Sequence, residues 1–181
     1  MVGDINLFLT PWEEDEEEDG DGGAHREARP GLKQKSDPDT FYCNGEVDIM
    51  VAERDQRGKG LGVSAVSTLL HFIRRHLESI LSEYGAAQKE QPGSGVRDGS
   101  RFELRDLVAK INAGNAGSIA LFTKLGFKQR GEVNYFGELE MVLEGFGMAS
   151  SSAEEEAGGT GAAYTDGYQE LVYDRSRLEA R

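Results

Sequence analysis

Residues 45–62 read GEVDIMVAERDQRGKGLG, and this stretch decides the fold class. Its first half alternates polar and apolar side chains, which predicts a strand over 46–52. Its second half is rich in glycine, and it leads into apolar residues at helical spacing over 60–84. Glycine permits turns that aim several backbone N–H groups at one point, and a helix start adds unpaired N–H groups. A strand, a glycine loop and a helix start in this order predict a phosphate-binding site.

The remaining apolar segments predict a mixed α/β sheet rather than a repeat protein. In chain order, we expect strands at 2–10 and 46–52, a helix at 60–84, a strand at 102–111, a short helix ending at Leu125, and strands at 127–133 and 138–143. Either Asn115 or Ser118 suits the start of the short helix, and Gly126 suits the position after its end.

Three segments have the composition of inserts or tails. Residues 12–40 are acidic and then rich in glycine and proline, so we expect a disordered insert there. A second loop insert is expected at 85–100, and residues 144–181 read as a Gly/Ala/Glu-rich tail with a short element around 169–178. The folded part is therefore expected within residues 1–143.

Charge and composition exclude several functions. The net charge is −13, but runs at 13–21 and 154–156 hold eight and three acidic side chains, so the folded part is nearly neutral. No basic stripe with interleaved aromatic residues indicates a nucleic-acid partner. The single cysteine, Cys43, excludes an internal disulfide, and the three scattered histidines argue against a metal site. No apolar run is long enough for a membrane span, and no signal peptide is recognisable, which predicts a cytoplasmic or nuclear protein.

The glycine loop allows three interpretations. A nucleotide-triphosphate loop needs a Lys-Ser or Lys-Thr pair after its last glycine, and this chain has none. A dinucleotide fingerprint is nominally present from Gly60 to Ala65, but five charged or polar residues separate the strand from the glycines, whereas a dinucleotide loop turns directly off its strand. The third interpretation is the coenzyme A loop, Gln/Arg-x-x-Gly-x-Gly/Ala, which Arg57 to Gly62 fits at every position.

A second segment supports the coenzyme A interpretation. Asn112-x-x-Asn115-x-x-Ser118, followed by LFTKLGF at 121–127, looks like the second cofactor motif of the GCN5-related N-acetyltransferase superfamily. Together with VGDINLFLT, GEVDIMVAE and RGKGLG, it is similar to the N-acetyltransferase 9-like subfamily over residues 2–11, 45–84 and 102–143. The resemblance implies an acyl-CoA N-acyltransferase fold that is N-terminally incomplete, because a strand, two helices and a strand normally precede the strand at 2–10.

The resemblance also implies where acetyl-CoA, the expected co-substrate, would lie. Its pantetheine arm would enter between two splayed parallel strands, here 46–52 and 105–111, and its pyrophosphate would meet the glycine loop. The residues implied in cofactor binding are Ile49, Met50, Val51, Arg57, Gly58, Lys59, Gly60, Leu61, Gly62, Asn112, Asn115, Ser118 and Phe122.

Catalysis requires a proton acceptor, because an amine attacks only in its neutral form. The resemblance makes Glu46 the first candidate base and Asp48, on the same strand face, the second. The alternative is that both are solvent-facing strand carboxylates. Phe122 stands where many members of the superfamily have a tyrosine that protonates the leaving thiolate, and phenylalanine has no proton to give.

Two functions follow as hypotheses. The first is acetyl transfer from acetyl-CoA to a protein amine, in particular an N-terminal α-amino group, with tubulin chains as the acceptor that the subfamily resemblance implies. The second is a non-catalytic, truncated relative that binds only coenzyme A or a protein partner.

Overall fold

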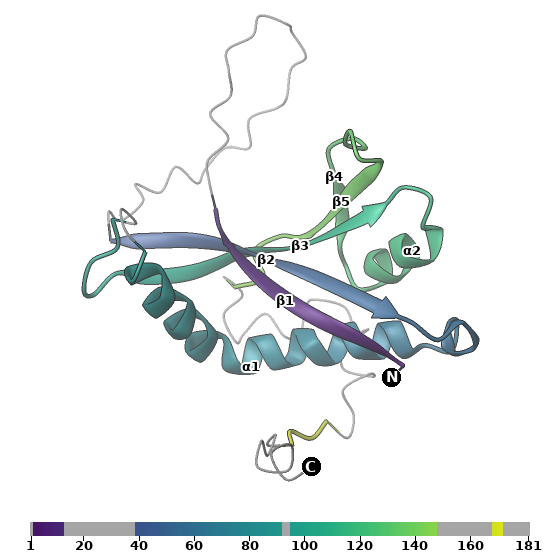
Figure 1. Cartoon of the computed structure of the whole chain (residues 1–181), viewed down its shortest axis with the longest axis horizontal. Helices are drawn as coiled ribbons and strands as arrows, with labels where there is room; N and C mark the ends of the chain where they lie inside the picture. The colour runs from purple at the N-terminus through teal and green to yellow at the C-terminus, as the bar shows by residue number, and fades with distance from the viewer. Residues whose placement is uncertain (1, 13–38, 92–94, 148–167, 172–181) are drawn as a thin grey trace, which may run out of the picture.

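The structure is a computed structural model that describes residues 2–12, 39–91, 95–147 and 168–171 (Figure 1). In chain order the described elements are β1 (Gly3–Pro11), β2 (Thr40–Val51), the 3₁₀ turn η1 (Arg54–Gln56), α1 (Leu61–Lys89), β3 (Arg101–Asn112), α2 (Ala116–Lys124), β4 (Lys128–Arg130) and β5 (Glu138–Leu143). The mixed α/β class predicted from the sequence is confirmed.

The five strands form one sheet in the order β1-β2-β3-β5-β4. Only the central pair, β2 and β3, is parallel, and the other described neighbours are antiparallel. Parallel neighbours need a long crossover, and the 29 residues of α1 supply it. The parallel pair thus follows directly from the strand–helix–strand order in the sequence.

The parallel pair separates before its strands end. β2 pairs with β3 from Thr40 opposite Arg101 as far as Glu46 opposite Val108. β2 then continues to Val51 while still paired with β1, and β3 continues to the end of its pairing with β5. Figure 1 shows the two strands diverging beyond this point. A register shift between Cys43 and Gly45, where β3 carries one extra residue, precedes the separation and is typical of a bulge that bends a strand.

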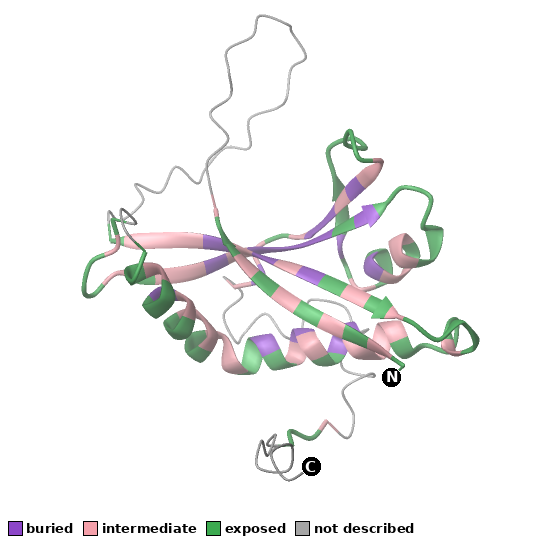
Figure 2. Cartoon of the chain, in the orientation of Figure 1, coloured by how far each residue is buried: buried purple, intermediate pink, exposed green. Residues whose placement is uncertain are grey.

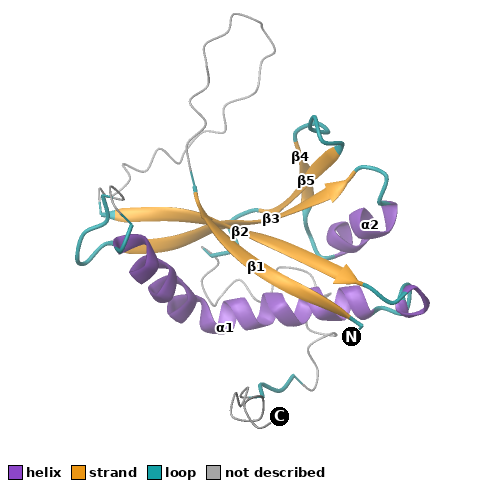
Figure 3. Ribbon diagram, viewed as in Figure 1, coloured by secondary structure: helices purple, strands orange, loops and turns teal. Residues whose placement is uncertain are grey.

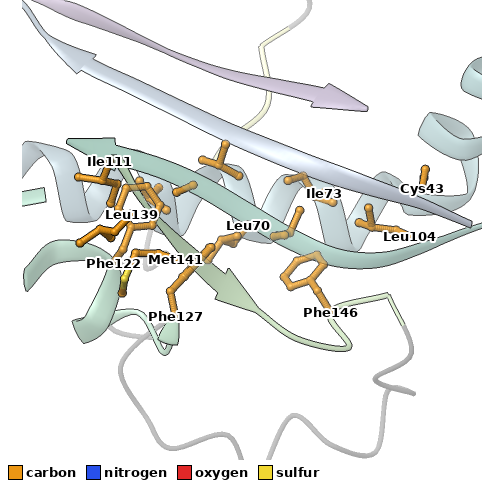
Figure 4. Packing of buried hydrophobic residues seen from close by; sticks show 14 residues of the cluster. Cys43, Leu70, Ile73, Leu104, Ile111, Phe122, Phe127, Leu139, Met141 and Phe146 are labelled. Atoms are coloured by element: carbon orange, nitrogen blue, oxygen red, sulfur yellow. The ribbon is translucent and has the colours of Figure 1, made fainter. Parts of the chain in front are cut away.

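The core lies between α1 and one face of the sheet (Figures 2 and 4). Val66, Leu70 and Ile73 recur at helical spacing on α1 and are buried. The sheet contributes alternate residues of its strands, such as Val47 of β2. Each fully buried aliphatic side chain contributes about 1.5–3 kcal/mol of transfer free energy. The same alternation directs Glu46 and its neighbours on that face away from α1.

α2 extends this core beyond the end of β3. Phe122 is 2% exposed and packs edge-on against Phe127, with 5.0 Å between ring centroids. The side chain of Asn115 caps the helix by accepting a hydrogen bond from the N–H of Ser118 at 3.1 Å, which decides between the two predicted starts. Gly126 follows the helix at φ 93°, a left-handed conformation that suits glycine.

Several predicted boundaries were wrong. β2 begins at Thr40 and not at 46, because its first part pairs with β3, where Phe41 stacks on Phe102. This start also places Thr40 of the expected insert 12–40 in the sheet, whereas its residues 13–38 lie outside the described residues.

The helix and the closing strands also differ from expectation. α1 runs to Lys89, so the first five residues of the expected loop 85–100 are helical. Gly85 is buried there, and a Cβ at this position would lie 2.6 Å from the Phe102 ring, so the helix meets β3 at a residue without a side chain. β4 covers only Lys128–Arg130 instead of 127–133, and it is followed by Gly131 at φ 70°.

Two parts of the expected tail 144–181 contact the body. Phe146 is 5% exposed and belongs to the core, and a Cβ on Gly147 would clash with the backbone of Leu104. Residues 168–171 lie against α1, where the Tyr168 and His71 rings meet edge-on at 4.6 Å. The rest of the element expected around 169–178 lies outside the described residues.

Candidate acetyl-CoA site

β2 and β3 part to form an opening between them (Figure 3), and beyond Glu46 the backbone groups on this side of β2 are not paired with β3. Along an antiparallel pair, every second residue turns its backbone N–H and C=O towards the partner strand. Hydrogen bonds from Trp12 N to Tyr42 O and from Ala52 N to Val2 O show that the even-numbered residues of β2 turn these groups towards β1. By this alternation the N–H and C=O groups of Ile49 and Val51 point towards β3. In the described part of the chain, β3 no longer pairs with them.

Met50 differs from its two neighbours. Its register partner is Asp4 of β1, and the alternation directs its backbone groups to that strand. Its side chain is 51% exposed on the sheet face opposite α1. Of the three residues expected to pair with the pantetheine arm, the structure therefore turns the backbones of two towards the opening.

The glycine loop lies between the end of β2 and the start of α1. Gly58 and Gly60 adopt φ 74° and 86°, which a residue with a Cβ rarely adopts. A Cβ on either would meet nothing within 4 Å, so the backbone conformation alone requires glycine here. Gly62 differs, because a Cβ there would lie 2.6 Å from the side chain of Leu121 on α2.

The start of α1 offers free N–H groups at the end of this loop. Gly60 is its N-cap and makes no side-chain cap, and the first helical hydrogen bond runs from Ser64 N to Gly60 O at 3.0 Å. The N–H groups of the first turn therefore have no partner within the helix. They share the positive end of the helix dipole, and this arrangement favours an anion such as a pyrophosphate.

Two basic side chains flank the loop. Arg57 donates from Nε to the carbonyl oxygen of Val51 at 2.8 Å, which ties the loop to the end of β2. Lys59 donates from Nζ to Oε1 of Gln56 at 3.3 Å. Both residues are exposed, so their positive charges stand beside the helix start. The structure thus gives Arg57 a role in shaping the loop in addition to its charge.

The second motif lies across the opening, at the end of β3. Asn112 closes a turn by accepting from the N–H of Gly114 at 2.9 Å, and Asn115 caps α2 through Ser118. Both asparagines are exposed. Phe122 instead lies inside the core and offers a ligand almost no surface. Of this motif, the turn and the helix start are accessible.

Glu46 and Asp48 share one sheet face, as predicted from strand alternation, and the structure shows that this face lies opposite α1. Glu46 stands at the last paired position before the opening, and its Oε2 accepts a hydrogen bond from Nζ of Lys110 at 2.8 Å. Asp48 is exposed two residues further along β2. Sequence reasoning missed Lys110, because only the register of β2 and β3 shows that it lies beside Glu46.

A largely apolar groove of about 860 Å³ adjoins the site on the side of β1. It is lined by the start of β1, by Ile49 and Val51, by the first half of α1 and by residues 168–171. Oε1 of Glu170 holds the last segment in place, accepting from His76 Nε2 at 2.9 Å and from the Tyr168 hydroxyl at 2.8 Å. These two hydrogen bonds, that of His76 first, lower the pKa of Glu170.

The described residues contain neither a membrane span nor a metal cluster. No described helix is long and apolar enough to cross a membrane. Within the same residues, no group of three or more His, Cys, Asp or Glu side chains is placed to hold a metal ion.

Comparison with known proteins places the chain in a family. The family model described as "Acetyltransferase (GNAT) domain" matches residues 6–128, which include most of β1, the glycine loop and the second motif. A solved structure of yncA, an acetyltransferase from Salmonella typhimurium with acetyl-CoA, is 25% identical and covers 56% of this chain and 47% of its own, at a TM-score of 0.36. That score is too low to support an argument.

Curated relatives match most of this chain. An N-acetyltransferase 9-like protein of Schizosaccharomyces pombe is 29% identical over 79% of this chain and 56% of its own length. The corresponding protein of Caenorhabditis briggsae is 30% identical over 80% and 50%, and human alpha/beta-tubulin-N-acetyltransferase 9 is 29% identical over 79% and 44%. The chain therefore spans about half the length of the curated relatives it matches. With the family model covering most of the chain, and with similarity to N-acetyltransferase 9-like proteins, the chain belongs to the GNAT acetyltransferase domain family.

Proposed function

We propose that this chain is an acetyl-CoA-dependent N-acetyltransferase that transfers an acetyl group to a protein amine, in particular an N-terminal α-amino group. The observation that carries the proposal is the separation of β2 and β3 beside the glycine loop at the start of α1. Family membership supports acetyl transfer as the reaction class.

The residues present fit acetyl-CoA as the co-substrate. The unpaired N–H groups at the start of α1, with Arg57 and Lys59 beside them, suit a pyrophosphate. The N–H groups of Ile49 and Val51 and the carbonyl oxygen of Ile49 suit the amide groups of a pantetheine arm, which can add to a strand edge as a peptide does. The carbonyl oxygen of Val51 already accepts a hydrogen bond from Arg57. An N–H group of this edge, aimed at a thioester oxygen, would stabilise the negative charge that develops there.

Glu46 is the proposed proton acceptor. It stands at the narrow end of the opening, on the face that neither described helix covers. At neutral pH most of an amine is protonated, so a carboxylate at this place would remove the proton that blocks attack. Asp48 is the second candidate, one step further out on the same face. The core position of Phe122 leaves protonation of the departing thiolate to water or to another group.

The acceptor is proposed from the relatives. The human and mouse relatives are named alpha/beta-tubulin-N-acetyltransferase 9, and each is 29% identical to this chain over 79% of its residues. We therefore propose the N-terminus of a tubulin-type chain as the acceptor to be tested first.

The test has two stages. Calorimetric titration with acetyl-CoA should show saturable binding, and mass spectrometry should then show acetylation of peptides with tubulin N-terminal sequences but not of the same peptides with a blocked N-terminus. No binding at sub-millimolar acetyl-CoA would contradict the proposal.

A second function is favoured by one observation. Phe122 stands where a tyrosine is expected, and its ring is buried in the core. A non-catalytic protein that binds coenzyme A or a protein partner would bind acetyl-CoA in the first stage and acetylate no amine in the second.

A further inference from the structure

Lys110 of β3 lies at the narrow end of the opening. Val108 is the last residue of β3 that pairs with β2, and Lys110 follows two residues later on the same face. Its Nζ lies 2.8 Å from Oε2 of Glu46, so the two side chains bridge the strands just where their backbones part. The side chains of Lys110 and Glu46 are 49% and 32% exposed, so the pair remains accessible to an approaching amine.

The pair stands among other charges on this sheet face. Lys110 is the register partner of Glu140 on β5, and Glu140 in turn accepts from Arg130 Nε at 2.7 Å. The other described charged residues on this face, from β1 to β4, are Asp4, Asp48, Arg101, Glu103, Arg105, Asp106, Lys128, Arg130, Glu138 and Glu140. Lys110 thus separates Glu46 from the two carboxylates of β5.

We propose that Lys110 is a positioning residue for Glu46: its ammonium group holds the Glu46 carboxylate at the mouth of the opening, in place for proton transfer. The inference rests on the proposed acetyltransferase function, and it adds a residue that neither the glycine loop nor the asparagine motif contains.

The charge of Lys110 is constant over the pH range in which an acetyltransferase would be assayed. The hydrogen bond to Glu46 raises the pKa of Lys110 above its ordinary value of 10.5. Lys110 therefore stays protonated at neutral and mildly alkaline pH, and its ammonium group can donate to Glu46 throughout this range.

The experiment measures kcat/KM against pH for peptide acetylation by the wild-type chain and its variants. In Lys110→Met, we expect kcat/KM to fall about tenfold throughout the profile, because the Glu46 carboxylate is no longer held in one position at the opening. Lys110→Arg retains the cation and should follow the wild-type profile. Calorimetric titration should give the same affinity for acetyl-CoA in all variants.

Lys128→Met is the matched control. Lys128 lies on the same sheet face as Glu46. It is opposite Val142, which is opposite Val108, which is opposite Glu46, so Lys128 and Glu46 are three strand spacings apart. At about 4.8 Å per strand the separation is ~14 Å, beyond the screening length at physiological salt. This variant should follow the wild-type profile. In a Glu46→Gln background, Lys110→Met should cause no further loss, because the two residues act in one step.

The outcomes separate two failures. A wild-type chain that acetylates no peptide refutes the proposed function, and the role of Lys110 falls with it. An active wild-type chain whose Lys110→Met variant keeps the wild-type kcat/KM refutes the positioning role alone. A loss that Lys110→Arg does not rescue, or that is equally large in the Glu46→Gln background, also refutes it, because that pattern indicates an effect that does not act through Glu46.

Discussion

Replacement of Gly60 by valine tests the assignment of the glycine loop. Gly60 adopts φ 86°, which costs a residue with a Cβ about 1–2 kcal/mol or more, and valine is among the least tolerant. No heavy atom lies within 4 Å of the position that a Cβ would take there, so the strain arises in the backbone and not from a clash. The chain can relieve it only by moving the loop, and this displaces the first N–H groups of α1.

The expected loss of affinity follows from those N–H groups. Hydrogen bonds to a charged group contribute about 1.5–3 kcal/mol each, so the loss of one raises the Kd for acetyl-CoA about tenfold to a hundredfold. Calorimetry measures the Kd, and urea unfolding should show a loss of at most about 2 kcal/mol, because the loop is exposed.

Gly99→Val is the matched control for this variant. Gly99 has φ 91°, and a Cβ there would also meet nothing within 4 Å, but it lies in the exposed loop that precedes β3. It should suffer similar backbone strain and keep wild-type affinity. If Gly60→Val binds acetyl-CoA as tightly as Gly99→Val, the loop does not hold the pyrophosphate and the assignment fails.

Three further predictions concern the scaffold. Gly85→Val should lower the free energy of urea unfolding by about 1–3 kcal/mol, because the valine side chain would meet the Phe102 ring. Ala86→Val, at the next and exposed position, should cost under about 1 kcal/mol. Equal losses in the two variants would refute the close contact at Gly85. Phe122→Ala should cost about 3–5 kcal/mol in the same assay, since the ring is 2% exposed, and a loss under about 1 kcal/mol would show that the ring is not in the core. Burial raises the pKa of the Cys43 thiol from 9.0 to about 11. Between these pH values the unfolded chain binds fewer protons than the folded chain, so the free energy of unfolding falls by roughly 2–3 kcal/mol as the pH rises. Cys43→Ala should remove this alkaline slope, and an unchanged slope would contradict it.

Local patterns predicted most of the fold, and the failures have a common cause. Alternation over residues 46–52 correctly predicted that Glu46 and Asp48 share one strand face, and the structure places Val47 on the other face, towards α1. The start of β2 at Thr40 could not be predicted, because Asn44 and Gly45 break the pattern and the strand there depends on pairing with β3. The end of α1 was missed because Gly85 reads as a helix stop, whereas in the structure the helix continues past it and a Cβ there would meet the Phe102 ring.

In the candidate site, too, features set by the local sequence could be predicted, and features that depend on strand pairing could not. The turn and the loop follow from short motifs, since Gly58 and Gly60 need positive φ and Asn115 needs to cap α2. The partner of Glu46 depends on the register between β2 and β3, which includes a shift of one residue that no local pattern reveals. Lys110 is therefore recognised only once the two strands are laid side by side.

The binding site is tested most directly by NMR titration of the ¹⁵N-labelled wild-type chain with acetyl-CoA. We predict saturable shifts of the amide signals of Ile49, Val51 and residues 58–62. The signals at the ends of β2 and β3 that are far from the opening, near Thr40 and Arg101, should change little. No saturable shifts, or shifts confined to those far ends, would contradict an acetyl-CoA site where β2 and β3 part.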